Sequence, residues 1–502
     1  MTVYNFNLGI GWASSGVEYA QAYRAQVFRK LGVDAKFIFT DFITAQNIER
    51  YTKNIGFKDS EVIWLYTAFT DFEVGPTTYT LADLEKHFPG KPTAQQEKGD
   101  RIRYEFADGG WIIAKLEEAG KQRVQWADFG HGPNLMRRDF YSSGRFLAEF
   151  YAPQEKRVEL RLRRFYNQNG SIAYEELPGA KGQPSFFRFK NKLIYSKAEL
   201  ISEFINQLKL SASDTILIDR ATGMAQQILE NRGPARVGVV VHADHFNAHR
   251  TNDDNILWNN YYEYTFQHAD LLDFFVTATA AQKTLLAAQF KKYTNFRPQI
   301  YAIPVGSLSK LRKGEERTPF SLITASRLAS EKHVDWLVSA VVKAKQELPE
   351  LTLDIYGYGG ELAALKSQIK AAGAEGYIRL KGHQDLTDVY THYQAYLSGS
   401  TSEGFGLTLL EAVGSGLAMI GFDVRYGNQT FIADGKNGIL LPYNQDEDSE
   451  LAVNDLAGAV VRLFKKLDFE RARQVSYDLA RAYLTTEVEN KWQALLEGEK
   501  HD

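Results

Sequence analysis

The stretch Ser400-Thr-Ser-Glu-Gly-Phe-Gly-Leu-Thr-Leu-Leu-Glu-Ala-Val-Gly-Ser-Gly416 holds the most informative pattern in this chain of 502 residues. It follows the apolar segment Ala395–Ser398, which is typical of a strand, passes through a glycine-bearing loop and enters a helical pattern. Free backbone N–H groups at the start of a helix favour an anion. Glu403 lies in the loop and Glu411 about two turns into the helix. The run can therefore offer amides to phosphate oxygens and carboxylates to hydroxyls, as a sugar nucleotide requires.

The segments around this run alternate between short apolar stretches and longer helical patterns. Such alternation is typical of a parallel sheet whose strands are joined by helices. The last helix is expected from about Phe469 to Leu496. The expected strands are Ser321–Ala325, Thr352–Tyr356, Tyr377–Leu380, Ala395–Ser398 and Ala418–Gly421. We therefore predict a Rossmann-like domain in this part of the chain.

A second α/β unit opens the sequence. Tyr4–Leu8 is a predicted strand, a loop containing Gly16 follows it, and apolar residues then recur at helical spacing. Later predicted strands are Lys36–Thr40, Thr215–Asp219, Arg236–Val241 and Leu271–Val276. A helix is predicted over Asn252–Gln267. The same strand–helix alternation indicates a doubly wound parallel sheet here too.

Between these strands the pattern changes to short alternating segments without a long helical pattern. Asn169-Gly170 and Gly109-Gly110 are hairpin turn signals. The segments are Arg101–Phe106, Trp111–Leu116, Arg123–Phe129, Val158–Tyr166, Ile172–Leu177 and Phe186–Tyr195. We predict an inserted antiparallel β-meander. It is either an ordinary elaboration or, because an open sheet has free edges and a free face, a surface for a partner.

Four parts of the chain follow from these patterns. The predicted parts are a Rossmann-like domain of residues 1–65 and 206–305, an inserted β-meander of residues 66–205, a second Rossmann-like domain of residues 306–485, and a terminal helix of residues 486–502 that packs back on the first domain.

Composition excludes several classes of function. Lys plus Arg number 59 and Asp plus Glu number 62, so the net charge of −3 provides no basic field for nucleic acid. The chain has no cysteine, which excludes disulfides and cysteine metal sites. The first residues lack the pattern of a signal peptide, and Val237–Val241 and Phe274–Ala281 are too short to cross a bilayer. We expect a cytoplasmic protein.

Three further segments combine predicted strand ends with glycines or cations. Arg327 and Lys332 flank a turn after a predicted strand, where they are either surface charges or partners for a diphosphate leaving group. The loop before Gly16 is either a tight structural turn or a place where a ligand approaches the backbone. Asp354–Glu361 is a similar glycine turn, and it either approaches a ligand or serves only as a structural turn. His383 and Gln384 follow another predicted strand, and backbone groups near them could form hydrogen bonds with the edge of a nucleotide base.

Two acidic or histidine-bearing segments raise the question of a metal. His242, Asp244 and His245 lie at a strand–loop junction, but no further matched ligand is nearby to complete a zinc site, so zinc is disfavoured. His242 is expected to donate a hydrogen bond to a bound sugar. Asp446-Glu447-Asp448 formally matches an Asp-x-Asp motif, but it lies in a polar stretch, which favours a surface position. We expect no metal site.

Together these motifs resemble the retaining glycosyltransferases of family 4, which have the GT-B fold. The glutamate pair of that family matches Glu403 and Glu411, and its arginine and lysine match Arg327 and Lys332. Its amino-domain glycine loop and strand-end histidine match Gly16 and His242. The resemblance implies an α/β GT-B protein with two Rossmann-like domains that face each other across a cleft, and an antiparallel sheet inserted in the first. It further implies that the first domain lies on the acceptor side, that the inserted sheet binds a partner or acceptor, and that the second domain holds the sugar nucleotide.

A closer resemblance covers essentially the whole chain. Asn7–Arg24, Ile256–Tyr262, Gly427–Phe431 and the inserted sheet resemble the A subunits of the Gram-positive O-N-acetylglucosaminyltransferases that modify serine-rich-repeat adhesins. The resemblance implies transfer of N-acetylglucosamine from UDP to serine or threonine before export by the accessory Sec system. It also implies a B subunit in an expected heterotetramer, and a cytoplasmic place with peripheral attachment to the membrane left open. Two alternatives are a UDP-glucose-dependent enzyme and a non-catalytic adhesin-binding chaperone.

The resemblance also implies roles for residues, with no cofactor and no metal. Arg327, Lys332 and the amides of Gly404–Leu407 would meet charge on the leaving phosphate. Glu411 would bind ribose hydroxyls and Glu403 would orient the donor sugar. The implied catalytic residues are Glu403, Arg327, Lys332 and His242, and the implied donor-binding residues are Gly16, Val17, Glu18, Tyr19, His383, Gln384, Glu403, Gly404, Phe405, Gly406, Leu407 and Glu411.

Overall fold

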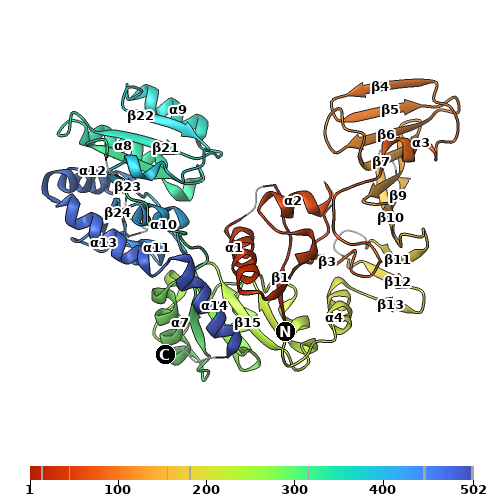
Figure 1. The fold of residues 1–502 in the computed structure, drawn as a ribbon, viewed down its shortest axis with the longest axis horizontal. Helices are drawn as coiled ribbons and strands as arrows, with labels where there is room; N and C mark the ends of the chain where they lie inside the picture. Colours follow the sequence, from red (N-terminus) through yellow and green to blue (C-terminus); the bar gives the residue numbers. More distant parts are fainter. Residues whose placement is uncertain are drawn as a thin grey trace. The chain divides into compact units, whose positions relative to one another are not determined.

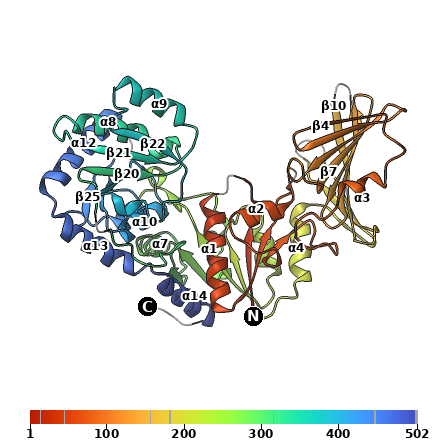
Figure 2. The same cartoon turned by 45° about the horizontal axis from the view of Figure 1, so that its top comes forward.

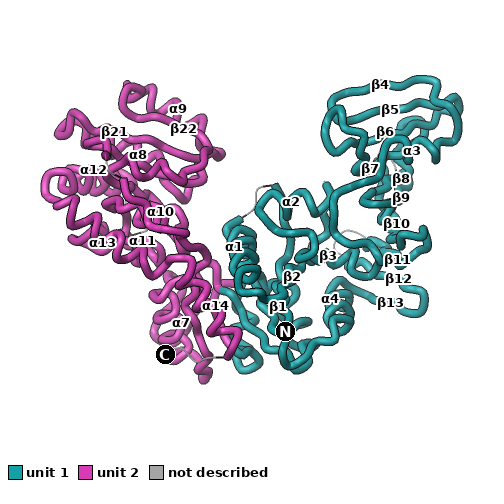
Figure 3. Tube along the Cα trace, in the orientation of Figure 1, with its two compact units in different colours: residues 1–240, 260–273 teal, residues 241–259, 274–502 magenta. Residues whose placement is uncertain are grey.

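The computed structural model describes residues 1–12, 15–43, 46–154, 157–179, 183–314, 316–444 and 448–498 (Figure 1). These residues form two compact units (Figure 3). The first compact unit comprises residues 1–240 and 260–273, and the second comprises residues 241–259 and 274–502. No helix among the described residues is long and apolar enough to cross a membrane.

The first compact unit contains a parallel sheet in the order β15-β14-β1-β2-β3. Its strands are β1 (Thr2–Asn7), β2 (Asp34–Phe39), β3 (Val62–Trp64), β14 (Thr215–Ile218) and β15 (Arg236–Val241). Strand β1 pairs with β2 on one side and with β14 on the other, so segments about 200 residues apart in sequence lie side by side. The side chains of Phe6, Phe28 and Phe37 are 0% exposed. Each contributes about 1.5–3 kcal/mol through burial.

Helices complete the α/β part of this unit. They are α1 (Gly16–Leu31), α2 (Ile48–Asn54), α4 (Lys197–Gln207), α5 (Ala225–Asn231) and α6 (Glu263–Gln267), with 3-10 turns η1 (Asp59–Glu61) and η3 (Ala269–Leu271). Helix α1 begins with a capping box, in which Ser15 and Glu18 satisfy each other's backbone N–H groups. It ends at Gly32, whose φ of 68° suits glycine.

The rest of the first unit is a ten-stranded antiparallel sheet in the order β13 to β4. Its strands are β4 (Ala94–Lys98), β5 (Arg101–Glu105), β6 (Gly110–Leu116), β7 (Val124–His131), β8 (Asn134–Tyr141), β9 (Arg145–Gln154), β10 (Arg157–Tyr166), β11 (Ile172–Leu177), β12 (Phe186–Phe189) and β13 (Lys192–Ile194). Leu81 and Leu84 of α3 (Leu81–Glu85) pack with buried residues of this sheet, and Figure 2 shows the helix beside the strands. The predicted antiparallel segments are confirmed, except that Phe186–Tyr195 forms two strands, β12 and β13, and that β4, β8 and β9 were missed.

The second compact unit contains a six-stranded parallel sheet in the order β22-β21-β20-β23-β24-β25. The strands are β20 (Ser321–Ala325), β21 (Thr352–Tyr356), β22 (Ile378–Gly382), β23 (Ala395–Leu397), β24 (Ala418–Phe422) and β25 (Gly438–Leu441). All five predicted strands are confirmed within a few residues. The order changes direction between β20 and β23, which makes that point the topological switch of a doubly wound sheet.

The remaining elements of this unit surround the sheet or precede it. The helices are α7 (Ala280–Tyr293), α8 (Val334–Ala344), α9 (Leu362–Ala371), α10 (Leu407–Gly414), α11 (Gly427–Phe431), α12 (Ser449–Lys466), α13 (Phe469–Arg481) and α14 (Thr485–Glu497), with turns η2 (Ala248–Arg250), η4 (Ser330–Lys332) and η5 (Tyr390–His392). A parallel pair, β18 (Phe274–Thr277) and β19 (Ile300–Ala302), and an antiparallel pair, β16 (Phe246–Asn247) and β17 (Leu257–Trp258), complete it.

Two predicted helices are wrong in extent. The helix expected over Asn252–Gln267 is only α6, because the segment before it holds β17 and an asparagine turn. Asn252 accepts the N–H groups of Asp254 and Asn255, a local hydrogen-bonding pattern that competes with a helix.

The single helix expected from Phe469 to Leu496 is instead α13 followed by α14. Leu308 pairs with Leu484 at the break: its N–H donates to the Tyr483 carbonyl, and its own carbonyl accepts the Thr485 N–H, both at 2.9 Å. A distant segment thus supplies the hydrogen bonds that the interrupted helix lacks.

Candidate functional site

The switch point of the six-stranded sheet brings two predicted site segments together. Strands β20 and β23 are parallel neighbours, so their carboxyl ends lie at the same edge. The segment after β20 carries Arg327 and Lys332, and the segment after β23 carries Glu403. Ligands of open α/β sheets bind outside the carboxyl ends of the strands at such a point.

Lys332 and Glu403 form an ion pair at this edge. The Lys332 Nζ donates to Glu403 Oε2 at 2.7 Å, and the two side chains are only 16% and 18% exposed. Lys332 ends η4, and His333 after it has a positive φ of 43° and precedes α8. A Cβ at Gly399 would lie 2.9 Å from the Lys332 carbonyl, so the glycine lets the two segments approach. The pair thus places one positive and one negative charge side by side in a position that is largely shielded from water.

The loop between Glu403 and α10 leaves backbone N–H groups available. Helix α10 begins after Gly406, which has φ 85°, and no side chain caps its first turn. A Cβ at Gly406 would lie 2.6 Å from Leu409 Cδ1 and 3.1 Å from Glu403 Cγ. Glycine is therefore required for the chain to turn directly from Glu403 into the helix. The uncapped helix start lies beside the Lys332–Glu403 pair in sequence and can receive an anion.

Glu411 lies on α10 and lines a cavity of about 180 Å³. Tyr390 donates to Glu411 Oε2 at 3.0 Å. The Glu411 side chain keeps solvent-accessible surface and lines the cavity, while many protein atoms lie close around its carboxylate. Burial raises the pKa of Glu411, and Asp385 raises it further, whereas the Tyr390 hydrogen bond and Arg312 oppose the shift.

Arg327, His383 and Gln384 lie at the surface of the same unit. Arg327 is 77% exposed and donates to Glu331 at 3.0 Å, not to Glu403. His383 and Gln384 are exposed after β22, and Gln384 donates to the Lys381 carbonyl at 2.8 Å. The residues that follow them, Asp385 to Thr387, line the cavity beside Glu411. Their predicted roles stay predictions.

His242 belongs to a segment that meets the Glu403 loop. A Cβ at Gly404 would lie 3.0 Å from the His242 carbonyl oxygen, so the two main chains are close. The neighbouring Asp244 and His245 are engaged with Tyr426. Among the described residues, no group of three or more His, Cys, Asp or Glu residues could hold a metal ion. Asp446 and Glu447 lie outside the described residues, and Asp448 caps α12 by accepting the Glu450 N–H.

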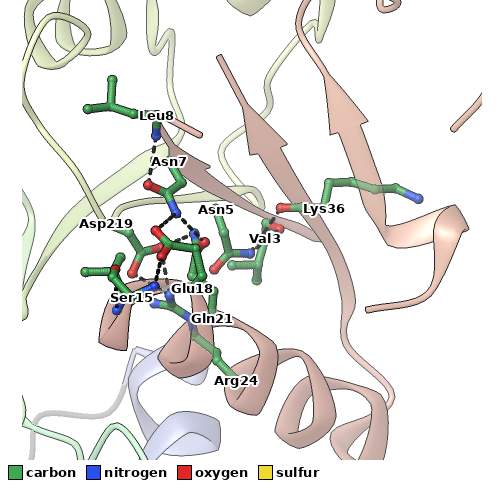
Figure 4. A network of polar contacts seen from close by, with 11 residues as sticks. Val3, Asn5, Asn7, Leu8, Ser15, Glu18, Gln21, Arg24, Lys36 and Asp219 are labelled. Atoms are coloured by element: carbon green, nitrogen blue, oxygen red, sulfur yellow. Dashed lines mark hydrogen bonds and ion pairs between the residues drawn. The ribbon is translucent and has the colours of Figure 1, made fainter. Parts of the chain in front are cut away.

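The predicted glycine loop belongs to the first compact unit, and Figure 4 shows Ser15 and Glu18 at the start of its helix α1. Gly16 is exposed, with no atom within 4 Å of the place that a Cβ would occupy, and Tyr19 is 50% exposed. Glu18 instead points inward and is 4% exposed. Its carboxylate accepts from the Ser15 N–H at 2.6 Å and from Asn7 at 3.1 Å. The Glu18 side chain therefore fixes the loop, and the predicted donor-binding role of Glu18 stays a prediction.

Sequence reasoning missed the buried network beneath this loop (Figure 4). Arg24 donates to both oxygens of Asp219 at 2.5 and 2.7 Å, and Gln21 donates to Asp219 at 2.7 Å. Asn7 donates to Gln21 at 2.9 Å. A signal was present, because Glu18, Gln21 and Arg24 recur every three residues on one helix face. Asn7 and Asp219 end or follow the adjacent strands β1 and β14.

Comparison with known proteins defines the class. The family model of group 1 glycosyl transferases matches residues 309–457, and a model of the GtfA extended beta-sheet domain matches residues 94–191. TarM shares the fold, with a TM-score of 0.74 at 17% identity over 99% of this chain and 98% of that one. The chain is therefore a glycosyltransferase of the GT-B fold, as expected.

Full-length relatives define the family within that class. The GtfA subunit of UDP-N-acetylglucosamine–peptide N-acetylglucosaminyltransferase from Streptococcus gordonii is 50% identical, with 100% of this chain and 99% of the relative covered. The pneumococcal O-GlcNAc transferase GtfA, solved in complex with UDP and GlcNAc, has a TM-score of 0.91 at 48% identity over 100% of this chain and 99% of that one. A GtfA/B complex has a chain with a TM-score of 0.96 at 50% identity, each chain being 99% covered. This chain belongs to the family of GtfA subunits, which confirms the resemblance found in its sequence.

Proposed function

We propose that this chain transfers N-acetylglucosamine from UDP-N-acetylglucosamine to serine or threonine hydroxyls of a protein, with retention of anomeric configuration. The observation that carries the proposal is the Lys332–Glu403 pair at the switch point, beside the uncapped start of α10. A pneumococcal relative with 48% identity was solved with UDP and GlcNAc, which supports this donor.

Each group of the site has a part in the proposed reaction. The bond between the anomeric carbon and the β-phosphate oxygen breaks, and a bond from the acceptor oxygen forms on the same face of the sugar. Lys332, assisted by Arg327 and the first amides of α10, offsets the negative charge that develops on UDP. Glu403 orients the sugar through its hydroxyls.

The acceptor proton needs a destination. In this proposal the departing phosphate oxygen takes it, so the reaction balances without a separate general base. Glu411 accepts hydrogen bonds from ribose hydroxyls, and His383 and Gln384 frame the uracil. His242 donates to the sugar, and Gly16 to Tyr19 contact the nucleotide part through the loop backbone and Tyr19. The raised pKa of Glu411 is compatible with this role. Burial deprives the carboxylate of water that would stabilise its charge, and a ribose hydroxyl that donates to it would take the place of that water.

The proposed biological acceptor is a serine-rich-repeat adhesin, modified in the cytoplasm before export. The enzyme would act with a B subunit as a heterotetramer, docked through the inserted antiparallel sheet, with peripheral attachment at the inner face of the membrane. The existence of a solved GtfA/B complex for a chain 50% identical to this one supports the partner.

One experiment tests the donor and the acceptor together. The chain is incubated with UDP-N-acetylglucosamine, the B subunit and a serine-rich peptide, and the peptide mass is measured. Addition of a hexosamine supports the proposal. Addition of a hexose from UDP-glucose, with none from UDP-N-acetylglucosamine, replaces the donor. Absence of UDP release with either donor favours a non-catalytic, adhesin-binding subunit.

A further inference from the structure

Residues 425–427 hold the main chain of Glu403. The Glu403 N–H donates to the Arg425 carbonyl at 3.2 Å. The N–H groups of Tyr426 and Gly427 both donate to the Glu403 carbonyl, at 2.6 and 2.7 Å. A Cβ at Gly427 would lie 2.2 Å from the Phe405 carbonyl oxygen and 2.9 Å from Glu403 Cγ. The position of Glu403 therefore depends directly on where these three residues lie.

The side chain of Tyr426 contacts the segment after β15, which contains Asp244 and His245. Tyr426 is 1% exposed. Its hydroxyl donates to Asp244 Oδ1 at 2.7 Å and lies 3.0 Å from His245 Nδ1. Its ring stacks with the imidazole of His245, with centroids 5.9 Å apart and planes at 12°. The phenol is thus fixed both by hydrogen bonds and by packing.

His245 is a buried, neutral partner for this phenol. The residue is 0% exposed, and burial lowers its pKa to about 4. The His245 Nε2 lies 2.6 Å from Gln289 Oε1. In the neutral tautomer that donates there, Nδ1 carries a lone pair and accepts. The single phenol proton of Tyr426 is therefore offered two acceptors, the Asp244 carboxylate and the His245 ring.

Asp244 is anchored on its other side. Its second oxygen, Oδ2, accepts from Arg425 at 2.8 Å, and the Arg425 guanidinium lies 4.5 Å from the centroid of the Phe246 ring. Asn259 donates to the Asp244 carbonyl at 2.9 Å. Asp244, to which the Tyr426 hydroxyl donates, is therefore held in place by both its side chain and its main chain.

We propose that Tyr426 is a positioning residue for Glu403, which it holds through its backbone while its hydroxyl anchors it to Asp244 and His245. The inference rests on the proposed function, in which Glu403 orients the donor sugar. Tyr426 acts through Glu403 and not on the substrate. Loss of its hydroxyl leaves the binding groups of the nucleotide, Glu411 and Lys332, in place, and a small displacement of Glu403 lowers the rate of the chemical step.

The test is Tyr426→Phe, which keeps the ring and removes the hydroxyl. We expect kcat for transfer from UDP-N-acetylglucosamine to fall by about 10- to 100-fold, because small misplacements near a reacting centre have effects of this size. KM for the donor should stay within about threefold, since nucleotide contacts are retained. A crystal structure of the variant should show the Glu403–Lys332 distance changed from 2.7 Å.

Tyr174→Phe is the matched control. Tyr174 is also 1% exposed, and its hydroxyl donates to the Tyr66 carbonyl at 2.6 Å in the first compact unit. Both variants leave a buried acceptor without its donor, which costs about 1–3 kcal/mol of stability. Similar losses of Tm with an unchanged kcat for Tyr174→Phe would separate positioning from general destabilisation.

The outcomes are distinct. The inference is overturned if Tyr426→Phe keeps kcat within about twofold of the parent, or if Tyr174→Phe loses as much. Should Tyr426→Phe not fold, Asp244→Asn, at a side chain that is 31% exposed, removes only the charge of the anchor. A kcat reduced about fivefold or more at constant KM then supports the inference, and an unchanged kcat opposes it. A parent protein that releases no UDP contradicts the proposed function instead.

Discussion

At the residue scale, the site depends on charges that the fold removes only partly from water. Lys332 and Glu403 retain 16% and 18% of their side-chain exposure, so their attraction is stronger than that of a surface pair. Arg327, at 77% exposure, has no such constraint and can move toward a ligand without breaking a buried contact. The two cations that the sequence analysis paired therefore differ in how firmly each is placed.

Glu403→Gln tests the role of this carboxylate. The amide keeps an oxygen that can accept from Lys332, but it lacks the charge, so we expect kcat for transfer to fall by about 100-fold. UDP release and peptide mass measure the loss. Glu347→Gln is the matched control, because Glu347 forms an exposed pair with Lys465 at 2.6 Å in the same unit. Activity of Glu403→Gln within a few-fold of the control would remove Glu403 from the catalytic set.

Glu411→Gln replaces a carboxylate whose charged form is disfavoured by burial. Because burial raises the folded-state pKa of Glu411 above its ordinary value of 4.5, the folded state binds that proton more tightly than the unfolded state. Stability from this group is complete below the ordinary pKa and is lost as pH rises through the raised pKa. The glutamine variant escapes that loss, so its Tm should exceed the parent's at pH 7.5 and approach it at pH 4.

The same variant should bind the donor less well. Losing one charged acceptor for a ribose hydroxyl should raise KM for UDP-N-acetylglucosamine about tenfold. Melting curves across pH and initial rates at pH 7.5 provide both readouts. A Tm difference that does not depend on pH would contradict the burial argument, and an unchanged KM would contradict the ribose contact.

At the element scale, glycines decide whether α10 can begin where it does. Gly406 combines a φ of 85° with a crowded Cβ position, whereas Gly435 has a φ of 68° with no atom within 4 Å. Both positions disfavour alanine through backbone strain of about 1–2 kcal/mol. Only at Gly406 must Leu409 and Glu403 also move, so the two positions separate strain from displacement.

Gly406→Ala should therefore affect catalysis, while Gly435→Ala should affect stability alone. We expect kcat of Gly406→Ala to fall by about 10-fold or more, since the helix start and Glu403 shift together. Gly435→Ala should lower Tm by a few degrees with kcat unchanged. Equal kcat values for the two variants would show that the turn at Gly406 does not set the geometry of the site.

The inserted sheet has its own internal electrostatics. Arg163 on β10 donates to Glu149 at 2.9 Å and to Glu176 at 3.0 Å, and both glutamates are 3% exposed. Its guanidinium also lies 3.7 Å from the centroid of the Phe42 ring. One cation thus stabilises two buried carboxylates, which explains how a sheet so rich in charges keeps a packed interior.

Arg163→Met should be strongly destabilising. Removing the shared cation leaves two carboxylates buried without it, with an expected cost of about 3–5 kcal/mol in the free energy of unfolding. Arg157→Met, on the same strand, removes a pair with Glu159 at 3.6 Å in which the arginine is 79% exposed, and should cost less than about 1 kcal/mol. Denaturant melts of both variants give the comparison, and equal midpoints would refute the buried network.

At the scale of the whole molecule, local patterns predicted more of the sheets than of the contacts between distant segments. Strand–helix alternation identified every strand of the six-stranded sheet except β25, and the position of Glu403 at a strand end followed from the same pattern. The site was thus found where adjacent strands end. The order of the strands, which makes β20 and β23 neighbours, required the structure.

Long-range contacts were beyond such reasoning. Tyr426 and Asp244 are 182 residues apart in sequence, and no periodicity connects them. The break between α13 and α14 likewise depends on Leu308, 176 residues before Leu484. Strand β9 was missed because its polar residues, such as Glu149, are satisfied by neighbouring strands and so can occupy buried positions. Local patterns report propensity, whereas these features depend on partners brought together by folding.

The source of positive charge for the leaving group gives the last prediction for the whole enzyme. Lys332, Arg327 and the start of α10 supply positive charge and oriented N–H groups at one edge, and the described residues contain no cluster that could hold a metal ion. If these groups suffice to offset the charge on UDP, an excess of EDTA should leave kcat and KM within about twofold of their values without chelator. Transfer by the full complex with its B subunit is the appropriate assay, with a manganese-dependent transferase as the control that EDTA must inactivate.

A loss of about tenfold or more, reversed by added Mg²⁺ or Mn²⁺, would mean that a divalent cation meets part of the phosphate charge. In that case Lys332→Ala should be rescued in part by raising the metal concentration, whereas in the metal-free reaction its kcat should stay low at every concentration.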